Sequence, residues 1–167
     1  MATQDNCKKL YSLIKDIGFA MMTTTTSDGS LRSRPMASRL EDEFDGTLWF
    51  FSHDQEPKIH EILENPQVNL AFADPSKNDY VSISGEATLV KDKAKAKDLW
   101  NPFYKAWFPK GLDDPHLGLI RVDVTQAEYW DSPNSKMVQL AGFVKALVTG
   151  REAQGGENEK INFQQAS

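Results

Sequence analysis

Six short segments rich in apolar and β-branched residues constrain the fold of this 167-residue chain more than any other feature. They cover residues 19–26, 31–40, 47–52, 68–73, 80–90 and 117–124. They do not alternate regularly with helices, as the strands of a doubly wound sheet would, and several follow one another through turns. The sequence therefore predicts a mainly β domain of the α+β kind, with six antiparallel strands arranged in a barrel or a sandwich.

Turn and bulge signals mark the limits of these strands. The sequence Ser27-Asp28-Gly29-Ser30 favours a tight turn, because Asp and Gly tolerate left-handed backbone angles. Residues 19–40 are therefore predicted to form a hairpin. Gly85 interrupts the alternating pattern of residues 80–90 and indicates a β-bulge.

Helical spacing of apolar residues appears in four other places. It predicts helices before Gly18, after Pro57, over residues 91–107 and over residues 140–147. Pro102 lies inside the third of these segments, so that segment should be kinked or divided into two short helices. All four helices flank the predicted strands.

Chain length and composition point to one folded domain with a short tail. A chain of this length suits a single domain, which we place at residues 1–150. Residues 151–167 are polar and rich in Gly and Gln, so they are predicted to form a disordered C-terminal tail.

Charge and cysteine content disfavour several classes of protein. The net charge of −5 argues against a nucleic-acid-binding protein, which usually has a basic excess. The longest uncharged stretch is residues 17–27, far short of the roughly 20 apolar residues that span a membrane, and the first 20 residues show no signal peptide. Cys7 is the single cysteine, so an internal disulfide is excluded and a cytoplasmic location is expected.

The segment Arg32-Ser33-Arg34-Pro35-Met36 is the first candidate binding site. On a strand, Arg32 and Arg34 point to one face and repel each other unless an anion lies between them. Phosphate is one such anion, and Pro35 indicates an edge or an irregular place in the sheet where backbone groups are free. The alternative is a solvated strand face whose charges are neutralised by the nearby acidic residues 41–43.

The end of the third predicted strand is a second candidate. Phe50-Phe51-Ser52 is followed by a helix start at Pro57 and by Lys58, and a helix N-terminus with a cation can bind an anion. The alternative is an ordinary capping serine with a surface lysine.

Aromatic residues and histidines provide weaker signals. Trp100, Phe103, Tyr104, Trp107 and Phe108 form an aromatic cluster, and the helical spacing of Trp100, Phe103 and Trp107 favours core packing over stacking on an aromatic ligand. His53 and His60 are seven positions apart and could share a helix face only if the helix began before Pro57. His116 lies beside Asp113 and Asp114 in a loop that could bind a metal, but a solvated acidic loop is the preferred interpretation. Nucleotide-binding glycine motifs and hydrolase motifs are missing from the sequence.

The order of three short motifs resembles a known family. R-S-R-P-M, W-F-F-S and W-F-P-x-G-x-D-D-P follow one another as in the general stress protein 26 group of the pyridoxamine 5′-phosphate oxidase-like, FMN-binding split-barrel superfamily. The resemblance covers roughly residues 5–150. It implies a six-stranded antiparallel split barrel and a homodimer with two flavin sites at the interface between the subunits.

The resemblance also assigns candidate site residues. The strand residues Arg32, Ser33, Arg34, Pro35 and Met36 would lie along the flavin, and Phe50, Phe51 and Ser52 would contribute near its phosphate side. Lys58 would contact the phosphate. Trp107 and Trp130 would line the pocket, in part from the other subunit.

The expected cofactor is FMN, with FAD as an alternative. The expected function is that of a flavin-binding general stress protein with a low oxidoreductase activity, whose electron donor the sequence does not identify. The chain does not show the full substrate-binding set of true pyridoxamine 5′-phosphate oxidases, which argues against oxidation of vitamin B6. The alternatives are a non-catalytic flavin carrier or sensor, and a haem-binding split barrel with His53, His60 or His116 as ligand.

Overall fold

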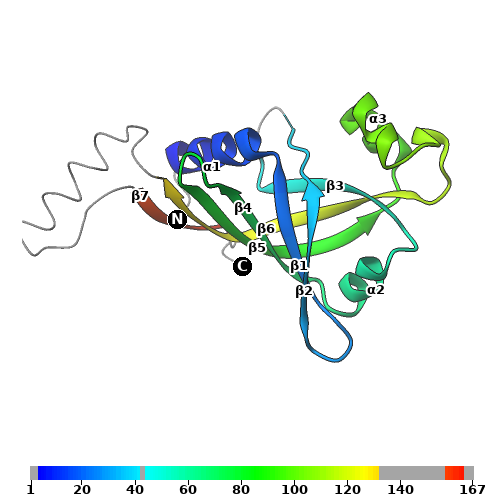
Figure 1. Ribbon diagram of the computed structural model, residues 1–167, viewed down its shortest axis with the longest axis horizontal. Coiled ribbons are helices and arrows are strands. Elements are labelled where there is room, and N and C mark those ends of the chain that lie inside the picture. Colours follow the sequence, from blue (N-terminus) through cyan, green and yellow to red (C-terminus); the bar gives the residue numbers. More distant parts are fainter. Residues whose placement is uncertain (1–3, 42–43, 132–156, 164–167) are drawn as a thin grey trace, which may run out of the picture.

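The computed structural model describes residues 4–41, 44–131 and 157–163 as one barrel with flanking helices (Figure 1). The strands are β1 (Phe19–Thr25), β2 (Leu31–Ala37), β3 (Thr47–His53), β4 (Gln67–Asp74), β5 (Asp79–Val90), β6 (Leu117–Asp131) and β7 (Glu157–Asn162). The helices are α1 (Gln4–Ile17), α2 (Pro57–Glu64) and α3 (Lys93–Leu99), followed by two 3₁₀ turns, η1 (Pro102–Ala106) and η2 (Gly111–Asp113).

Six of the strands form the predicted antiparallel barrel. Their order in the sheet is β2-β1-β4-β5-β6-β3, and every neighbouring pair is antiparallel. The two ends of this order meet through a bridge between Arg39, just after β2, and Trp49 of β3. The split barrel expected from the resemblance is therefore confirmed, and the bridge closes it only over a short length.

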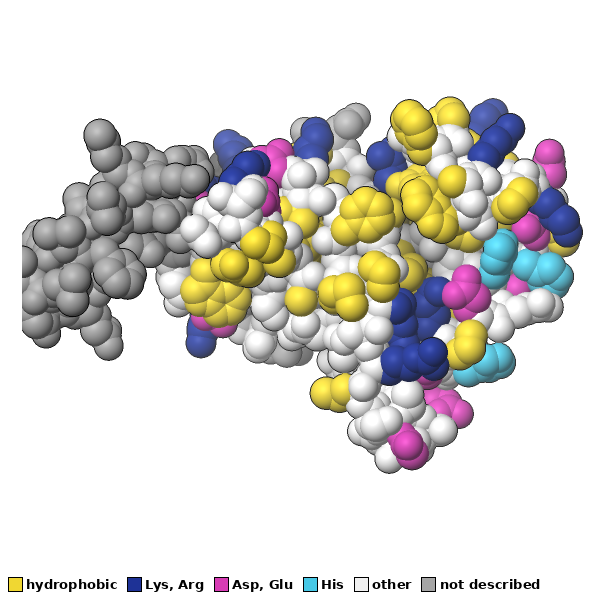
Figure 2. All heavy atoms as spheres, viewed as in Figure 1, with side chains coloured by type: hydrophobic (Ala, Val, Ile, Leu, Met, Phe, Trp, Pro, Cys, Tyr) yellow, Lys and Arg dark blue, Asp and Glu magenta, His cyan; other side chains and the backbone are white. Residues whose placement is uncertain are grey.

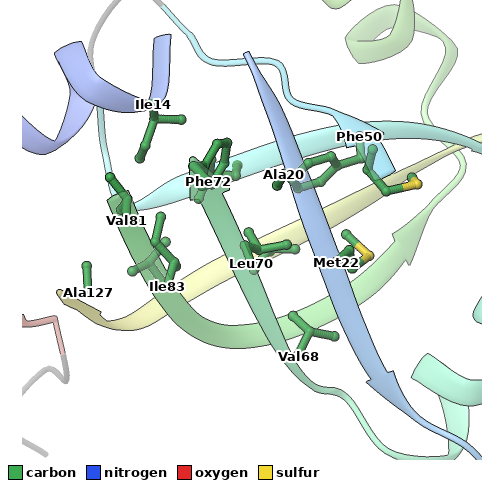
Figure 3. Close-up of a cluster of buried hydrophobic side chains, with 14 of the residues drawn as sticks. Ile14, Ala20, Met22, Phe50, Val68, Leu70, Phe72, Val81, Ile83 and Ala127 are labelled. Carbon is green, nitrogen blue, oxygen red and sulfur yellow. The ribbon is translucent and has the colours of Figure 1, made fainter. Parts of the chain in front are cut away.

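The barrel interior is filled by apolar side chains from alternate strand positions. Figure 3 shows this cluster, which includes Ile14, Ala20, Met22, Phe50, Val68, Leu70, Phe72, Val81, Ile83 and Ala127. Helix α1 packs against β4 and β5 and adds Leu10 and Ile14, which are fully buried. The helix thus covers apolar surface that the strands alone would leave in water.

A second apolar cluster lies on the other face of β3. Trp49 and Phe51 of β3 pack there with Leu99 of α3, Phe108 and Leu119. Residues 47–52 are consequently buried on both faces, as their continuous apolar run indicates. This second cluster fixes the segment from α3 to η2 beside the barrel.

Local signals in the sequence are largely confirmed. The residue 19–40 hairpin forms β1 and β2, and the register between β5 and β6 shifts at Ser84 and Gly85. A Cβ atom at Gly85 would lie 2.6 Å from the carbonyl oxygen of Asp123, so the bulge leaves room only for glycine. The third helical segment is divided at Pro102 into α3 and η1.

The predicted disordered tail is wrong for residues 157–162. These residues form β7, which pairs antiparallel with the end of β6 from Gln126 to Asp131. Ile161 is buried there, so one apolar side chain anchors an otherwise polar strand. The helix predicted over residues 140–147 lies outside the described residues. No helix in the described part of the chain is long and apolar enough to cross a membrane.

Candidate functional site

A cavity of about 330 Å³ lies where β2, β3, the start of α2 and η1 meet. Most of its wall is apolar, formed by Phe19, Pro35, Met36, Ala37, Phe51, Tyr104, Trp107 and Phe108. Its polar residues are His53, Glu56 and Lys58, which follow one another at the junction of β3 and α2. The cavity therefore combines an apolar slot with a charged corner, and Figure 2 shows Lys and Arg side chains beside hydrophobic ones on one face of the molecule.

The aromatic rings of the wall pack on one another and on Trp100 of the second apolar cluster. The ring of Phe51 lies 5.0 Å from that of Tyr104 and 5.4 Å from that of Trp100, measured between centroids. The side chain of Asn101 caps η1 by accepting a hydrogen bond from the backbone N–H of Phe103. Trp107, just after η1, keeps 60% of its surface exposed, so it is free to cover a ligand.

The charged corner is centred on Lys58. Pro57 opens α2, which places Lys58 in the first turn, and only 8% of this lysine is exposed. Its Nζ donates to the carboxylate of Glu56. A buried ammonium at a helix N-terminus attracts anions, because the free backbone N–H groups and the helix dipole act in the same direction.

Arg34 is held by groups of the protein itself. Its guanidinium donates to Oε2 of Glu61 at 2.9 Å and to Oγ1 of Thr24 at 2.6 Å. Arg32 is mostly exposed, and its Nη1 lies 3.9 Å from the other oxygen of Glu61. The anion between the two arginines is therefore Glu61 of α2, rather than the acidic residues 41–43 that we considered as neutralising charges.

His53 of the cavity wall and His116 each have a ring nitrogen near an aspartate carboxylate. Nε2 of His53 lies 3.3 Å from Oδ2 of Asp114, and Nδ1 of His116 lies 3.1 Å from Oδ1 of Asp54. Asp114 also accepts the backbone N–H of His116. That hydrogen bond is the main reason why the pKa of Asp114 lies below its ordinary value, although burial opposes it. Among the described residues, no group of three or more His, Cys, Asp or Glu side chains is placed to hold a metal ion.

The structure brings five of the predicted site residues to the cavity wall. These are Pro35, Met36, Phe51, Lys58 and Trp107. All five come from segments that the sequence singled out, so the candidate site is assembled from the expected parts of the chain.

The other predicted residues lie elsewhere in this chain. Phe50 points into the barrel core, and Ser52, on the same side of β3, is buried and donates to the carbonyl oxygen of His53. Ser33 is hydrogen-bonded across the hairpin to Thr23. Trp130 lies near the far end of β6, opposite Tyr80 of β5.

Several residues of the cavity wall were not among the flavin-binding residues predicted from the sequence, although His53 was considered as a haem ligand and Tyr104 and Phe108 as part of the aromatic cluster. They are Phe19, Ala37, His53, Glu56, Tyr104 and Phe108. His53 and Glu56 lie in the chain between Ser52 and Lys58, which were both predicted to bind the ligand. Their closeness in sequence to these two residues could have identified them. Phe19 lies directly opposite Ala37 across the hairpin. A predicted register for the hairpin would have placed these two residues together, beside Pro35 and Met36.

Comparison with known proteins gives the family. Residues 5–154 match the family described as pyridoxamine 5′-phosphate oxidase like. Protein bli-3 of Neurospora crassa is 29% identical over 165 residues, which cover 93% of this chain and 79% of that protein.

Solved structures agree with the barrel. The general stress FMN/FAD binding protein of Xanthomonas citri is 30% identical, with a TM-score of 0.69 over 80% of this chain and 92% of its own. A protein of Clostridium acetobutylicum related to general stress protein 26 is 16% identical, with a TM-score of 0.71 over 97% of both chains, and shows the same fold. Because the family match spans most of its length, this chain belongs to the pyridoxamine 5′-phosphate oxidase-like family.

Proposed function

We propose that this protein binds a flavin, and FMN in particular, in the cavity between β2, β3, α2 and η1. The observation that carries the proposal is the union of an apolar aromatic slot with a buried lysine at a helix N-terminus. FMN has a flat apolar ring system and a phosphate, and it needs both kinds of surface. The cavity volume of about 330 Å³ lies at the lower end of the range for small-molecule sites, roughly 300–1,000 Å³.

The residues of the cavity divide naturally between the two parts of the ligand. Lys58 and the first turn of α2 would hold the phosphate, while Pro35, Met36, Phe51 and Trp107 would enclose the ring. When bound, the flavin supplies the electron-transfer chemistry, and the protein supplies position and electrostatics. The name of the Xanthomonas citri relative, an FMN/FAD binding protein, also supports a flavin and keeps FAD as the alternative.

Replacement of Lys58 by alanine is expected to weaken FMN binding by about 1.5–3 kcal/mol, the usual worth of a hydrogen bond to a charged group. Riboflavin lacks the phosphate, so its affinity should change much less. Quenching of flavin fluorescence on titration with protein measures both affinities. A matched control is Lys105→Ala on η1, outside the cavity wall, and equal FMN affinity in wild type and Lys58→Ala would contradict the phosphate assignment.

A low oxidoreductase activity is part of the proposal, with a flavin carrier or sensor as the alternative. Histidine is the usual side chain for proton exchange near neutral pH, and His53 lies in the cavity wall, where its Nε2 is buried without a hydrogen-bond partner among the described residues. Reduction of the bound flavin by NADH or NADPH, followed by reoxidation by an added acceptor over many cycles, would support the enzyme over the carrier. A haem protein has less support, since the cavity joins its apolar slot to a lysine suited to a phosphate, and of the three candidate histidines only His53 lies in the cavity wall. The cytoplasmic location stays a prediction.

We further propose a homodimer that completes the flavin site. Exposed apolar side chains form a row across the outer face of the barrel, where Tyr80 lies opposite Ala73 of β4 and Trp130 of β6. Met21 of the same face is exposed, and Phe19 belongs both to this face and to the cavity wall. Burial of such a row against a second copy would bring the partner chain to the mouth of the cavity.

Substitution of Met21 by glutamate is therefore expected to shift the protein from dimer to monomer and to weaken FMN binding. Sedimentation velocity measures the assembly, and fluorescence titration measures the binding. Leu63→Glu is the matched control, because Leu63 is 68% exposed on helix α2, outside the strands that form the row. A wild-type protein that stays monomeric at all concentrations would refute the dimer.

A further inference from the structure

The only lysine or arginine among the described residues of the cavity wall is already paired with an acid of the same wall. Lys58 Nζ donates to Oε2 of Glu56, and both side chains line the cavity. The side chain of Lys58 is 10% exposed, whereas that of Glu56 is 41% exposed. The two partners differ accordingly: the ammonium is fixed in the wall, and the carboxylate can turn away into solvent.

The position of Glu56 in the chain explains why its carboxylate lies on Lys58. Glu56 is the N-cap residue of α2, with extended backbone angles, and its side chain makes no capping hydrogen bond to the first turn. The backbone carbonyl of Glu56 accepts the N–H of Ile59, so the first turn does not depend on the carboxylate. The other carboxylate oxygen lies 4.0 Å from Nδ1 of His53, which offers a second polar neighbour when the side chain leaves Lys58.

We infer that Glu56 is an internal competitor for the ligand phosphate, and that it limits the affinity of the site for phosphorylated flavins. The inference rests on the proposed function and goes beyond it by assigning a residue that sets specificity. A phosphate monoester carries a charge of about −1.5 to −2 at pH 7. With Glu56 ionised on Lys58, the charges of the pair cancel, so an incoming phosphate meets no net positive charge and must displace a carboxylate. Riboflavin brings no anion and does not compete.

The opposite role for Glu56 makes the opposite prediction. If the carboxylate served to orient Lys58 toward the phosphate, its removal would weaken FMN binding. If it only stabilised α2, its removal would change FMN and riboflavin binding alike. The sign and the selectivity of the change therefore distinguish the three roles.

The test is the variant Glu56→Gln, which keeps the size of the side chain and removes its charge. We expect about tenfold tighter FMN binding than in wild type, which corresponds to about 1.4 kcal/mol, with unchanged riboflavin binding. Glu64→Gln at the other end of α2 is the matched control, since Glu64 is exposed, lies outside the cavity wall and gives the same change in net charge. The gain should disappear in the double variant Glu56→Gln/Lys58→Gln.

Each other result overturns the inference. FMN binding by Glu56→Gln that is unchanged, weaker, or no tighter than in Glu64→Gln excludes competition at Lys58. An equal gain for riboflavin shows a change of the whole cavity rather than of the anion site. Wild-type protein that binds FMN while Glu56→Gln shows no gain refutes this inference alone, whereas absence of flavin binding in wild type and in both variants refutes the proposed function as well.

Discussion

Replacement of Arg34 by alanine is expected to lower the free energy of unfolding by about 3 kcal/mol. Glu61 is only 8% exposed, and the Arg34 guanidinium neutralises it at 2.9 Å. Removal of one partner leaves a buried charge without compensation, which costs about 3–5 kcal/mol in buried pairs. The lower end of that range applies because the side chain of Arg34 is 19% exposed. Urea denaturation at pH 7 measures the loss.

The neighbouring arginine provides the control. Arg32 lies on the same face, but its side chain is 62% exposed and 3.9 Å from Glu61, so Arg32→Ala should cost well under about 1 kcal/mol. A second substitution, Glu61→Gln, should recover part of the loss in Arg34→Ala by removing the unpaired charge. Equal losses in the two arginine variants would show that Glu61 does not depend on Arg34.

Because the pKa of Glu61 is lowered, the difference in stability between wild type and Arg34→Ala depends on pH. Burial raises this pKa, but the hydrogen bond from Thr24 and the charges of Arg34 and Arg32 outweigh burial and hold it below its ordinary value of 4.5. A carboxylate with a lowered pKa stabilises the fold above its unfolded pKa, and this stabilisation is lost as the pH falls through the folded pKa. The difference in stability between wild type and Arg34→Ala should therefore narrow in acid, below about pH 4.5.

The ion pair also changes how the arginine segment is interpreted. A phosphate between Arg32 and Arg34 was the hypothesis from the sequence, and strand geometry correctly placed both side chains on one face. Their carboxylate partner is 27 positions further along the chain from Arg34, on a helix that only the folded barrel brings near. A role of this segment in flavin binding stays a prediction, and it falls most directly on Pro35 and Met36, which line the cavity.

Local sequence patterns predicted most of the strands and turns, because each pattern depends only on residues that are neighbours in the chain. The alternation of β5, the turn after β1 and the bulge at Gly85 depend on backbone preferences within a few positions. Strand β7 was not predicted, because its sequence, ENEKIN, is polar. Its partner, the end of β6 from Gln126 to Asp131, is also far away in the sequence. Its single buried apolar residue, Ile161, gives no periodic signal.

Strand β3 shows that local patterns also could not predict which residues of the site face the cavity. Side chains of a strand alternate, so Phe50 and Phe51 must point to opposite faces. Both faces of β3 are buried, one in the barrel and one under α3 and η1, so the sequence offers no polar side to tell them apart. The sequence therefore identified the correct segment but could not assign Phe51 to the cavity and Phe50 to the core.

Phe50→Ala tests this assignment, with an expected loss of about 3–5 kcal/mol in the free energy of unfolding. Phe50 is fully buried among the side chains of the barrel core (Figure 3), so truncation leaves a cavity that the barrel cannot refill. Phe103→Ala removes an equally large ring that is 82% exposed and should change stability by less than about 0.5 kcal/mol. Thermal and urea unfolding measure both variants.

Flavin affinity separates the core residue from the cavity residue. Phe50→Leu retains most of the apolar volume and should be more stable than Phe50→Ala, with FMN affinity close to that of wild type. Phe51→Leu removes an aromatic ring from the cavity wall and should weaken both FMN and riboflavin, because the ring system is common to the two ligands. If Phe50→Leu lost flavin binding while remaining as stable as wild type, Phe50 would belong to the site, and the face of β3 that meets the flavin would be the reverse of the one assigned from the cavity.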